Sequence, residues 1–260
     1  MLTGATSGIG QAILPALLEQ GLRLVLVGRS PSKLAGLHDA LSAYKGRFQT
    51  VVCELSDPES RVTACAEILE SNERIDGFIS NAAIDPRREF EHTSVPFFRQ
   101  VMATNLEPAI DFSQRLLPRL KESAAGRVVL IGSVNWEIAG TYLTAYNTSK
   151  AALVGLTRSM AHELAPIGIT VNCLSPGAIM VEKEAIRPGR DQDLIELQSV
   201  RRRLTPDDLV GPLLLLLSEA GGGISGQILP VDGGLIHPLA TAGMQQKRLE
   251  HDRENSAFLQ

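Results

Sequence analysis

Short apolar runs alternate with longer helical patterns along most of the chain. The apolar runs cover residues 22–27, 48–53, 75–80, 127–131, 169–174 and 227–231. The helical patterns lie at residues 10–20, 32–44, 58–71, 96–121, 145–165 and 206–218. This alternation is typical of parallel strands joined by crossover helices, and runs that are apolar almost throughout indicate strands covered on both faces. We therefore predict an α/β fold with a doubly wound sheet.

The chain is predicted to form one domain. Residues 1–235 carry no linker, repeat or low-complexity tract, and their number is ordinary for a single α/β unit. The composition shifts beyond Gly234, and residues 245–254 are polar and charged. We expect residues 236–260 to be a C-terminal extension, in which residues 245–254 form a surface helix, a partner contact or a frayed tail.

Charge and composition exclude several classes of protein. With 25 basic and 29 acidic side chains the net charge is −4, which argues against nucleic acid as the main partner. No apolar run reaches the roughly 18–20 residues that a membrane helix needs. The three cysteines, Cys53, Cys65 and Cys173, are scattered without metal-ligand spacing, and an odd set of this kind suits a reducing compartment. We predict a cytoplasmic protein without a metal site or a signal peptide.

The start of the chain leaves little room for a first strand. Only Met1 and Leu2 precede the predicted turn at Thr3, whereas strands are usually about five residues long. A shortened central strand would leave the backbone of its neighbours without ladder partners. We expect the sequence to be truncated at its start, and a short but tolerated strand is the alternative.

A glycine-rich turn opens the first helical pattern with the spacing T-G-x-x-x-G-x-G over residues 3–10. Glycines let backbone amides approach a phosphate closely, and the helix N-terminus adds partial positive charge. The turn also precedes the second strand at the distance seen in dinucleotide-binding units. We predict that it binds the phosphates of a dinucleotide, the alternative being a purely structural turn.

The end of the second strand bears on which dinucleotide is bound. An acid there would bind the ribose 2′-hydroxyl of NAD, but the chain has Gly28 followed by Arg29. A guanidinium at this place pairs with a 2′-phosphate. We predict a preference for NADP, with NAD as the alternative cofactor. The alternative for Arg29 is that its side chain only stacks on the adenine or is solvated.

Tyr146 and Lys150 are spaced to share one face of a helix. A free phenol has a pKa of about 10 and is a poor acid–base group near neutral pH. A nearby ammonium favours the phenolate and lowers that pKa, so the pair is a candidate proton donor with its activator. Alone, this spacing occurs by chance in many helices and favours a solvated helix face. Ser133 strengthens the catalytic interpretation, because it follows a predicted strand at the sheet edge where open α/β folds bind ligands.

With these residues the chain resembles the short-chain dehydrogenase/reductase family, in its branch of about 250 residues. The resemblance runs from Thr3 to about Gly234 and depends on an ordered set of motifs. These are the glycine turn, Asn81-Ala82-Ala83, Asn105, Ser133, Tyr146, Lys150, Asn172, Pro176-Gly177, Gly226-Gln227 and Asp232-Gly233-Gly234. The resemblance implies a Rossmann fold with a mostly parallel seven-stranded sheet, helices on both faces and a substrate lid at about residues 178–205.

The resemblance also implies a mechanism and a cofactor site. Tyr146 is the general acid in carbonyl reduction and the base in alcohol oxidation, while Lys150 binds the nicotinamide ribose and lowers the pKa of Tyr146. Ser133 orients the substrate oxygen, and Asn105 holds a water that links Lys150 to solvent. The implied cofactor-binding residues are Gly4, Thr6, Ser7, Gly8, Ile9, Gly10, Arg29, Glu54, Leu55, Asn81, Ala82, Ala83, Tyr146, Lys150, Pro176, Gly177 and Ile179.

The chain departs from the family pattern at a few positions, and none of them removes a catalytic group. Glu54 replaces an Asp that usually contacts adenine, Ala83 narrows a turn that usually has Gly, and Val181 replaces a Thr that commonly binds the carboxamide. The first strand is also short. These departures leave open an alternative function, a non-catalytic nucleotide-binding scaffold or sensor.

The implied activity is interconversion of a carbonyl and a secondary alcohol on a small polar substrate, such as a sugar, a sugar acid or a 3-oxoacyl group. Arg87 and Arg88 are candidates for receiving a substrate carboxylate or phosphate, and surface exposure is the alternative. Trp136 is a candidate for stacking on a sugar ring, or for packing against the lid. The family commonly assembles as tetramers or dimers, so we expect a homotetramer or homodimer.

Overall fold

The computed structural model describes residues 1–181 and 195–236, and these residues form a seven-stranded sheet. Its spatial order is β3-β2-β1-β4-β5-β6-β7, and every neighbouring pair is parallel. The strands are β1 (Leu2–Thr3), β2 (Leu24–Gly28), β3 (Phe48–Val52), β4 (Gly77–Ser80), β5 (Arg127–Ile131), β6 (Thr170–Pro176) and β7 (Ile228–Val231). The predicted doubly wound Rossmann fold is confirmed. The strand order reverses between β1 and β4, which is where such sheets bind ligands.

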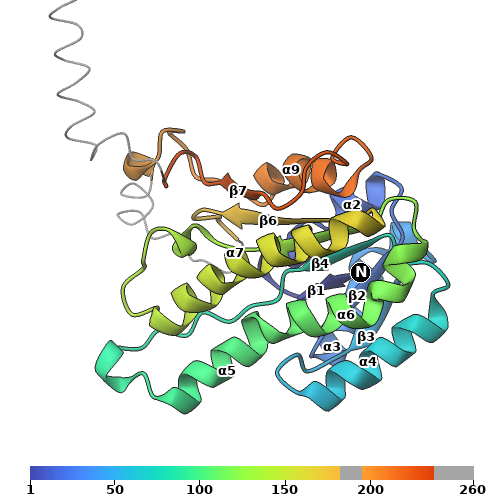
Figure 1. Ribbon diagram of the computed structural model, residues 1–260, viewed down its shortest axis with the longest axis horizontal. Coiled ribbons are helices and arrows are strands. Elements are labelled where there is room, and N and C mark those ends of the chain that lie inside the picture. The colour runs from blue at the N-terminus through green and yellow to red at the C-terminus, as the bar shows by residue number, and fades with distance from the viewer. Residues whose placement is uncertain (182–194, 237–260) are drawn as a thin grey trace, which may run out of the picture.

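Helices cover both faces of this sheet, as predicted. Figure 1 shows α6 and α7 in front of it, and the second face is covered by α2, α3 and α9. The helices are α1 (Gly8–Ala12), α2 (Leu14–Glu19), α3 (Pro31–Ala40), α4 (Pro58–Ser71), α5 (Val95–Asn105), α6 (Glu107–Glu122), α7 (Thr144–Leu164) and α9 (Asp207–Leu217). Short 3-10 turns are η1 (Ser42–Tyr44), η2 (Phe90–His92), η3 (Val134–Trp136) and η4 (Ala165–Ile167).

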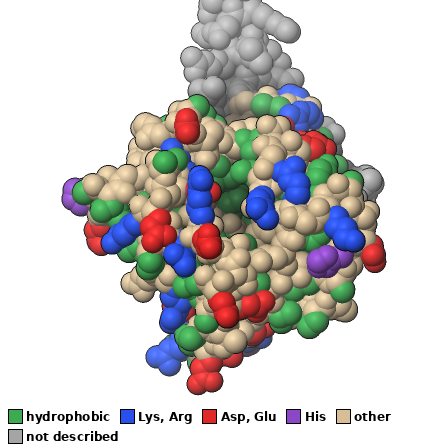
Figure 2. Space-filling view, turned by 90° about the vertical axis from the view of Figure 1, so that its right-hand side faces the viewer, with side chains coloured by type: hydrophobic (Ala, Val, Ile, Leu, Met, Phe, Trp, Pro, Cys, Tyr) green, Lys and Arg blue, Asp and Glu red, His purple; other side chains and the backbone are tan. Residues whose placement is uncertain are grey.

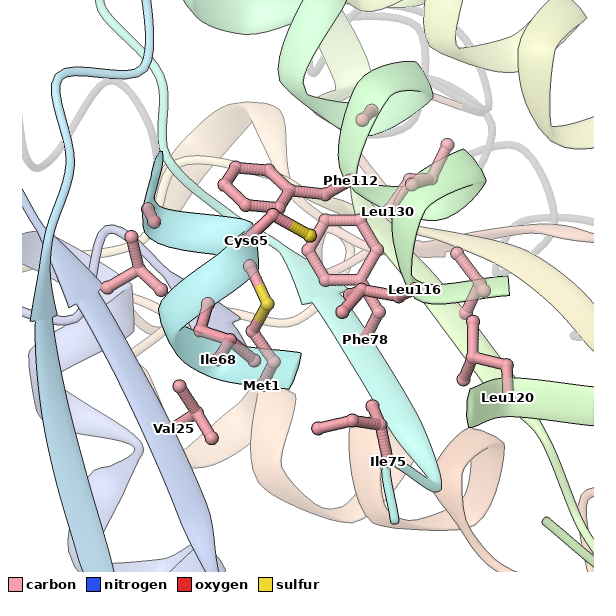
Figure 3. Close-up of a cluster of buried hydrophobic side chains, with 14 of the residues drawn as sticks. Met1, Val25, Cys65, Ile68, Ile75, Phe78, Phe112, Leu116, Leu120 and Leu130 are labelled. Atoms are coloured by element: carbon pink, nitrogen blue, oxygen red, sulfur yellow. The ribbon is translucent and has the colours of Figure 1, made fainter. Parts of the chain in front are cut away.

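Two buried layers hold the helices to the sheet. Along β5, Val128 and Leu130 enter the layer beneath α4, α6 and α7, while Val129 enters the opposite layer, as the period of two along a strand requires. In the first layer the rings of Phe78 and Phe112 lie 6.0 Å apart at 53° (Figure 3). Burying each such ring contributes roughly 1.5–3 kcal/mol, so this pair holds α6 against β4.

The segment predicted as one helix at residues 96–121 is two helices. α5 ends at Asn105, and α6 begins at Glu107 with Pro108 in its first turn. Proline has no N–H and is tolerated in a first turn but not in a helix interior, so the chain restarts the helix there. Pro15 has the same effect on the predicted helix at 10–20, which divides into α1 and α2.

The first strand is short but central. Leu2 pairs with Leu26 of β2 and with Ile79 of β4, and the carbonyl of Met1 accepts the N–H of Ile79 at 2.9 Å. Met1 itself lies in the core (Figure 3). The two residues of β1 therefore connect the two halves of the sheet. The expected truncation at the start of the sequence stays a prediction.

Charged side chains of both signs are spread over one side of the described surface. Figure 2 shows the side of the molecule where the strands begin, and basic and acidic side chains are interspersed over it. A DNA-binding surface would instead carry a basic stripe. Among the described helices, none is long and apolar enough to cross a membrane.

Candidate active site

The glycine turn between β1 and α1 is shaped by three glycines. Gly4 and Gly8 have φ values of 71° and 53°, a region that side chains disfavour. A Cβ on Gly10 would lie 2.2 Å from the carbonyl oxygen of Gly4, so only glycine fits there. A Cβ on Gly8 would meet no atom within 4 Å, so open space adjoins this backbone. A tight turn beside open space is the cradle that a phosphate group needs.

Thr3 ties the glycine turn to the end of β4. Its buried hydroxyl accepts the backbone N–H groups of Asn81 at 3.0 Å and Ala82 at 3.2 Å. In addition, Nδ2 of the Asn81 side chain donates a hydrogen bond to the carbonyl of Thr3 at 3.0 Å. The two predicted cofactor segments, residues 3–10 and 81–83, therefore form one rigid unit.

The adenosine end of the predicted cofactor site lies at the ends of β2 and β3. Arg29 is exposed after β2, and within the described parts of the chain it forms no ion pair. Glu54 uses one carboxylate oxygen to accept both the N–H and the hydroxyl of Ser56, at 3.2 and 2.8 Å. The carbonyl of Leu55 accepts Nη1 of the buried Arg61 at 2.5 Å, which fixes this loop.

Tyr146 and Lys150 stand on the first turns of α7, as the spacing predicts. The ammonium of Lys150 is buried and donates to the carbonyl of Ile131 at 2.8 Å, at the end of β5. Its nitrogen lies 5.6 Å from the centre of the Tyr146 ring. Burial lowers the pKa of Lys150 from 10.5 to about 8, although the charge of Asp85 opposes the fall.

The phenol of Tyr146 has a raised pKa, and its lowering by Lys150, which the family resemblance implies, stays a prediction. Burial raises the pKa of the Tyr146 phenol, Ser133 lowers it by hydrogen bonding, and the charge of Asp85 raises it. The ammonium of Lys150 donates to the carbonyl of Ile131 and is itself desolvated. The buried site therefore keeps the phenol protonated at neutral pH.

Asn105 ends α5 and holds the segment after β4. Its Oδ1 accepts the N–H of Ile84 at 2.8 Å, and its Nδ2 donates to the carbonyl of Ile84 at 2.9 Å. The same Nδ2 donates to the hydroxyl of Ser149 on α7 at 3.0 Å. The side chain is thus engaged mainly with protein groups, and the predicted water of Asn105 stays a prediction.

A hydrogen-bonded chain that the sequence did not reveal surrounds Ser133. Its hydroxyl donates to Oδ1 of Asn135 at 3.1 Å and accepts the N–H of Asn135 at 3.2 Å. Nδ2 of Asn135 donates to Oδ1 of Asn147 at 2.8 Å, and Nδ2 of Asn147 donates to the carbonyl of Gly140 at 3.0 Å. Ser133 is therefore joined to a connected pair of amides, which ends on a backbone carbonyl.

Arg87 and Arg88, the candidate anion-binding residues, are both engaged with the rim of the site. Nη1 of Arg87 donates to the carbonyl of Thr141 at 3.3 Å, and the N–H of Arg88 donates to the carbonyl of Tyr142 at 2.8 Å. The guanidinium of Arg88 stacks 4.0 Å above the ring of Phe97. The two arginines brace two loops against each other, and both side chains stay exposed.

The predicted nicotinamide-lining residues follow β6. A Cβ on Gly177 would lie 2.7 Å from Cα of Asp232, so glycine permits close contact with the end of β7. Ile179 is buried and forms an isolated parallel β-bridge with Leu204. The two residues lie near the two ends of the predicted lid. Val181 lies at the edge of the described residues, and lid residues 182–194 lie outside them.

Comparisons with known proteins agree with this geometry. A family model described as enoyl-(acyl carrier protein) reductase matches residues 4–236. L-Rhamnose 1-dehydrogenase (NADP(+)) of Thermoplasma acidophilum is 32% identical over 91% of this chain and 95% of its own. Dehydrogenase/reductase SDR family member 4 of Rattus norvegicus is 31% identical over 90% of this chain and 85% of its own. The chain belongs to the short-chain dehydrogenase/reductase family.

The solved structures of this family share the fold. A gluconate 5-dehydrogenase from Burkholderia cenocepacia, in complex with NADP and tartrate, superposes with a TM-score of 0.83. It is 26% identical over 90% of this chain and 93% of its own. In the present short-chain dehydrogenase/reductase, the four predicted catalytic residues come from α5, the end of β5 and the start of α7. Asn105 contacts the segment after β4, Lys150 contacts the end of β5, and Ser133 follows that strand.

Proposed function

We propose that this chain is an NADP-dependent oxidoreductase that interconverts an alcohol and a carbonyl on a small polar substrate of the sugar type. One observation carries the proposal. The nitrogen of Lys150 on α7 donates to the carbonyl of Ile131 at the carboxyl end of β5, two residues before Ser133, and lies 5.6 Å from the ring centre of Tyr146. This is where a parallel α/β sheet binds ligands, so the hydroxyls of Ser133 and Tyr146 can meet one substrate oxygen.

The residues present fit NADP as the cofactor. Gly4, Gly8 and Gly10 form the phosphate cradle, since Gly8 opens onto free space and Gly10 cannot carry a Cβ. Arg29 offers an exposed guanidinium for a 2′-phosphate. When bound, NADP would accept or supply the hydride. The remaining residues that would hold it are Thr6, Ser7, Ile9, Glu54, Leu55, Asn81, Ala82, Ala83, Pro176, Gly177 and Ile179.

Tyr146 is the proposed proton donor and acceptor. Burial raises the pKa of its phenol, so near neutral pH the hydroxyl is protonated and ready to donate to a carbonyl oxygen. In alcohol oxidation the same residue accepts the proton, and a higher pH favours this direction because more phenolate is present. Ser133 holds the substrate oxygen beside Tyr146 in both directions.

Lys150 is the proposed link between Tyr146 and solvent. Its lowered pKa of about 8 lets the amine gain and lose a proton near neutral pH. Its contact with the carbonyl of Ile131 fixes it below the phenol. Asn105 is proposed to hold a water of the proton relay, for which one lone pair of its Oδ1 is not used by Ile84.

Support for a sugar-type substrate comes from the named relatives and from the rim of the site. The two relatives named for a substrate above are a rhamnose and a gluconate dehydrogenase. Asp85 places a carboxylate near Tyr146, and carboxylates readily accept hydrogen bonds from sugar hydroxyls. A 3-oxoacyl substrate is the second candidate, because the description of the matching family model names an acyl group on a carrier protein, although the enoyl group it names is an alkene and not a ketone.

The test is turnover by the purified chain with NADP and a panel of neutral sugars, sugar acids and 3-hydroxyacyl thioesters. Reduction of NADP by a sugar or sugar acid supports the proposal, and oxidation of thioesters alone supports the second candidate. NADP binding without turnover of any compound would favour a non-catalytic nucleotide sensor.

Cofactor preference has its own test in Arg29→Ala. We expect wild-type kcat/KM to favour NADP over NAD, and the substitution to reduce that ratio at least tenfold. A charge-assisted contact contributes about 1.5–3 kcal/mol, which is one to two powers of ten. Lys33→Ala, at another exposed cation of the same loop and helix, is the matched control. A wild-type preference for NAD that Arg29→Ala leaves unchanged would overturn the assignment.

We also propose that the chain acts as a cytoplasmic homotetramer or homodimer on small molecules, without nucleic acid or membrane partners. The cysteine pattern supports the location, and the family resemblance supports the assembly. Light scattering of the purified chain measures the assembly directly.

A further inference from the structure

Arg61 is a buried cation near the start of α4. Its side chain is 5% exposed, and an arginine is almost never buried to this degree unless it is paired. Its Nε donates to Oδ2 of Asp111 on α6 at 2.7 Å, and its Nη1 donates to the carbonyl of Leu55 at 2.5 Å. The guanidinium therefore joins α6 to the loop that follows β3, across 50 residues of sequence.

Asp111 is a firm anchor for this guanidinium. Its second oxygen, Oδ1, accepts Nε of Arg115 at 2.6 Å. Burial raises the pKa of Asp111, but the hydrogen bonds and charges of Arg61 and Arg115 outweigh burial and lower that pKa overall. The carboxylate is therefore ionised at neutral pH, and it holds Arg61 by charge as well as by hydrogen bonding. The next residue, Phe112, is fully buried, so α6 itself is fixed in the core.

The loop of residues 53–56 lies at the adenosine end of the proposed cofactor site. The N–H of Cys53 donates to the carbonyl of Gly28 at the end of β2, at 3.0 Å. The N–H of Ala5, in the glycine turn, donates to the carbonyl of Val27 at 3.2 Å. Since β2 lies between β3 and β1, this loop and the glycine turn flank the end of β2 at the carboxyl edge of the sheet, where such folds bind ligands.

The carboxylate of Glu54 depends on the peptide that Arg61 holds. It accepts the N–H of Ser56 at 3.2 Å and the hydroxyl of Ser56 at 2.8 Å. That N–H belongs to the same planar peptide as the carbonyl of Leu55, so the two groups turn together. A buried carbonyl that loses its donor is costly. Without Arg61 the carbonyl would turn toward water, and the bond from the N–H of Ser56 to Glu54 would be lost.

We propose that Arg61 and Asp111 are positioning residues for the adenosine half of the cofactor, because they hold the Leu55–Ser56 peptide, and through it the carboxylate of Glu54, from helix α6. Neither Arg61 nor Asp111 contacts the cofactor in this proposal. The inference rests on the proposed function, since it deepens the assignment of Glu54 and Leu55 to the cofactor site. It extends that site to a helix on which no cofactor-binding residue is assigned.

The main test variant is Arg61→Met. Methionine keeps an unbranched apolar side chain without a donor, and Asp111 keeps its bond to Arg115. The probe is adenosine 2′,5′-bisphosphate, the adenosine half of NADP, and its binding is measured by calorimetry. We expect its dissociation constant to rise about tenfold, because the loop must then be ordered on binding. NADP and NAD should weaken by the same factor, so their ratio stays constant, whereas Arg29→Ala changes that ratio.

Three further variants control for a general loosening of the fold. Arg115→Met removes the other guanidinium of Asp111 without touching the loop, and it should keep the affinity within about twofold because this partner is more exposed. Asp111→Ala frees Arg61 from its anchor and should weaken the probe about threefold. Asp111→Asn keeps an oxygen for Nε of Arg61 and should restore most of that loss. Circular dichroism at the temperature of the calorimetry shows that each variant is folded.

The outcomes separate this inference from the proposed function. Wild-type affinity in Arg61→Met, or an equal loss in Arg115→Met, overturns the inference even if the wild-type enzyme is active. If Arg61→Met does not fold, equal affinities of Asp111→Ala and Asp111→Asn overturn it. The expected losses in a chain without turnover support the inference and count against the proposed function alone. A wild-type chain that binds neither the probe nor NADP overturns both.

An active enzyme gives a second measurement. In Arg61→Met the KM for NADP should rise, while kcat and the KM for the sugar stay close to wild type at saturating NADP, because the change is confined to the adenosine end. A fall in kcat together with a rise in both KM values would show a general structural role and would overturn the inference.

Discussion

Thr3→Val should destabilise the fold and weaken cofactor binding together. The hydroxyl of Thr3 accepts two backbone N–H groups, from Asn81 and Ala82, and valine keeps the shape of threonine without this acceptor. Leaving a buried donor unpaired costs about 1–3 kcal/mol. Asn81 and Ala82 are half-buried, so we take about 1 kcal/mol for each, or about 2 kcal/mol for the variant. In a protein of this size that lowers Tm by about 4–8 °C.

Thr3→Ser is the matched control, because it keeps the acceptor and loses one buried methyl group, worth about 0.8 kcal/mol. Thermal unfolding of wild type, Thr3→Ser and Thr3→Val, with and without NADP, reports both the stability of the fold and the binding of the cofactor. We expect Tm to fall in the order wild type, Thr3→Ser, Thr3→Val, and the increase in Tm on adding NADP to be smallest in Thr3→Val. If Thr3→Val is as stable as Thr3→Ser and gains as much from NADP, the hydroxyl does not join the glycine turn to β4.

Two further predictions concern buried charges. Arg61→Ala should cost about 3 kcal/mol, the low end for a broken buried pair, because Asp111 keeps its bond to Arg115. Arg115→Ala, at a more exposed partner, should cost less than about 1 kcal/mol in the same urea titration, and equal costs would contradict this account. Lys150 has a pKa of about 8 when folded and 10.5 when unfolded, so between these values the unfolded chain binds more protons and stability rises with pH. The unfolding free energy of wild type relative to Lys150→Met should therefore rise by about 3 kcal/mol from pH 8 to pH 10.5, and a flat difference would show that the amine is not desolvated.

The sequence was sufficient for the layers of the fold and the location of the site. The strand at Arg127–Ile131 and the helix at Pro58–Ser71 match their predicted bounds, since apolar runs and a proline start mark them clearly. The break at Leu106 was missed because the apolar pattern continues across it, and only Pro108 in the next turn hints at it. Local pattern therefore predicts which elements exist more reliably than where they break.

The site was predictable in membership but not in electrostatics. Spacing placed Tyr146 and Lys150 on one helix, but it could not show that the ammonium binds the carbonyl of Ile131 or that burial raises the pKa of Tyr146. The pair Asn135 and Asn147 was missed for a similar reason. Their contact depends on the path of the loop through Gly140, which no periodicity encodes.

The central claim is that Tyr146 transfers a proton to or from the substrate oxygen while NADP exchanges a hydride. The direct measurement is the rate of NADPH formation by wild type and Tyr146→Phe with the best substrate of the panel, alongside calorimetric binding of NADP. The account predicts a kcat about 10²–10⁴-fold lower in the variant, with NADP affinity changed little. A variant that binds NADP and turns over at the wild-type rate would contradict it.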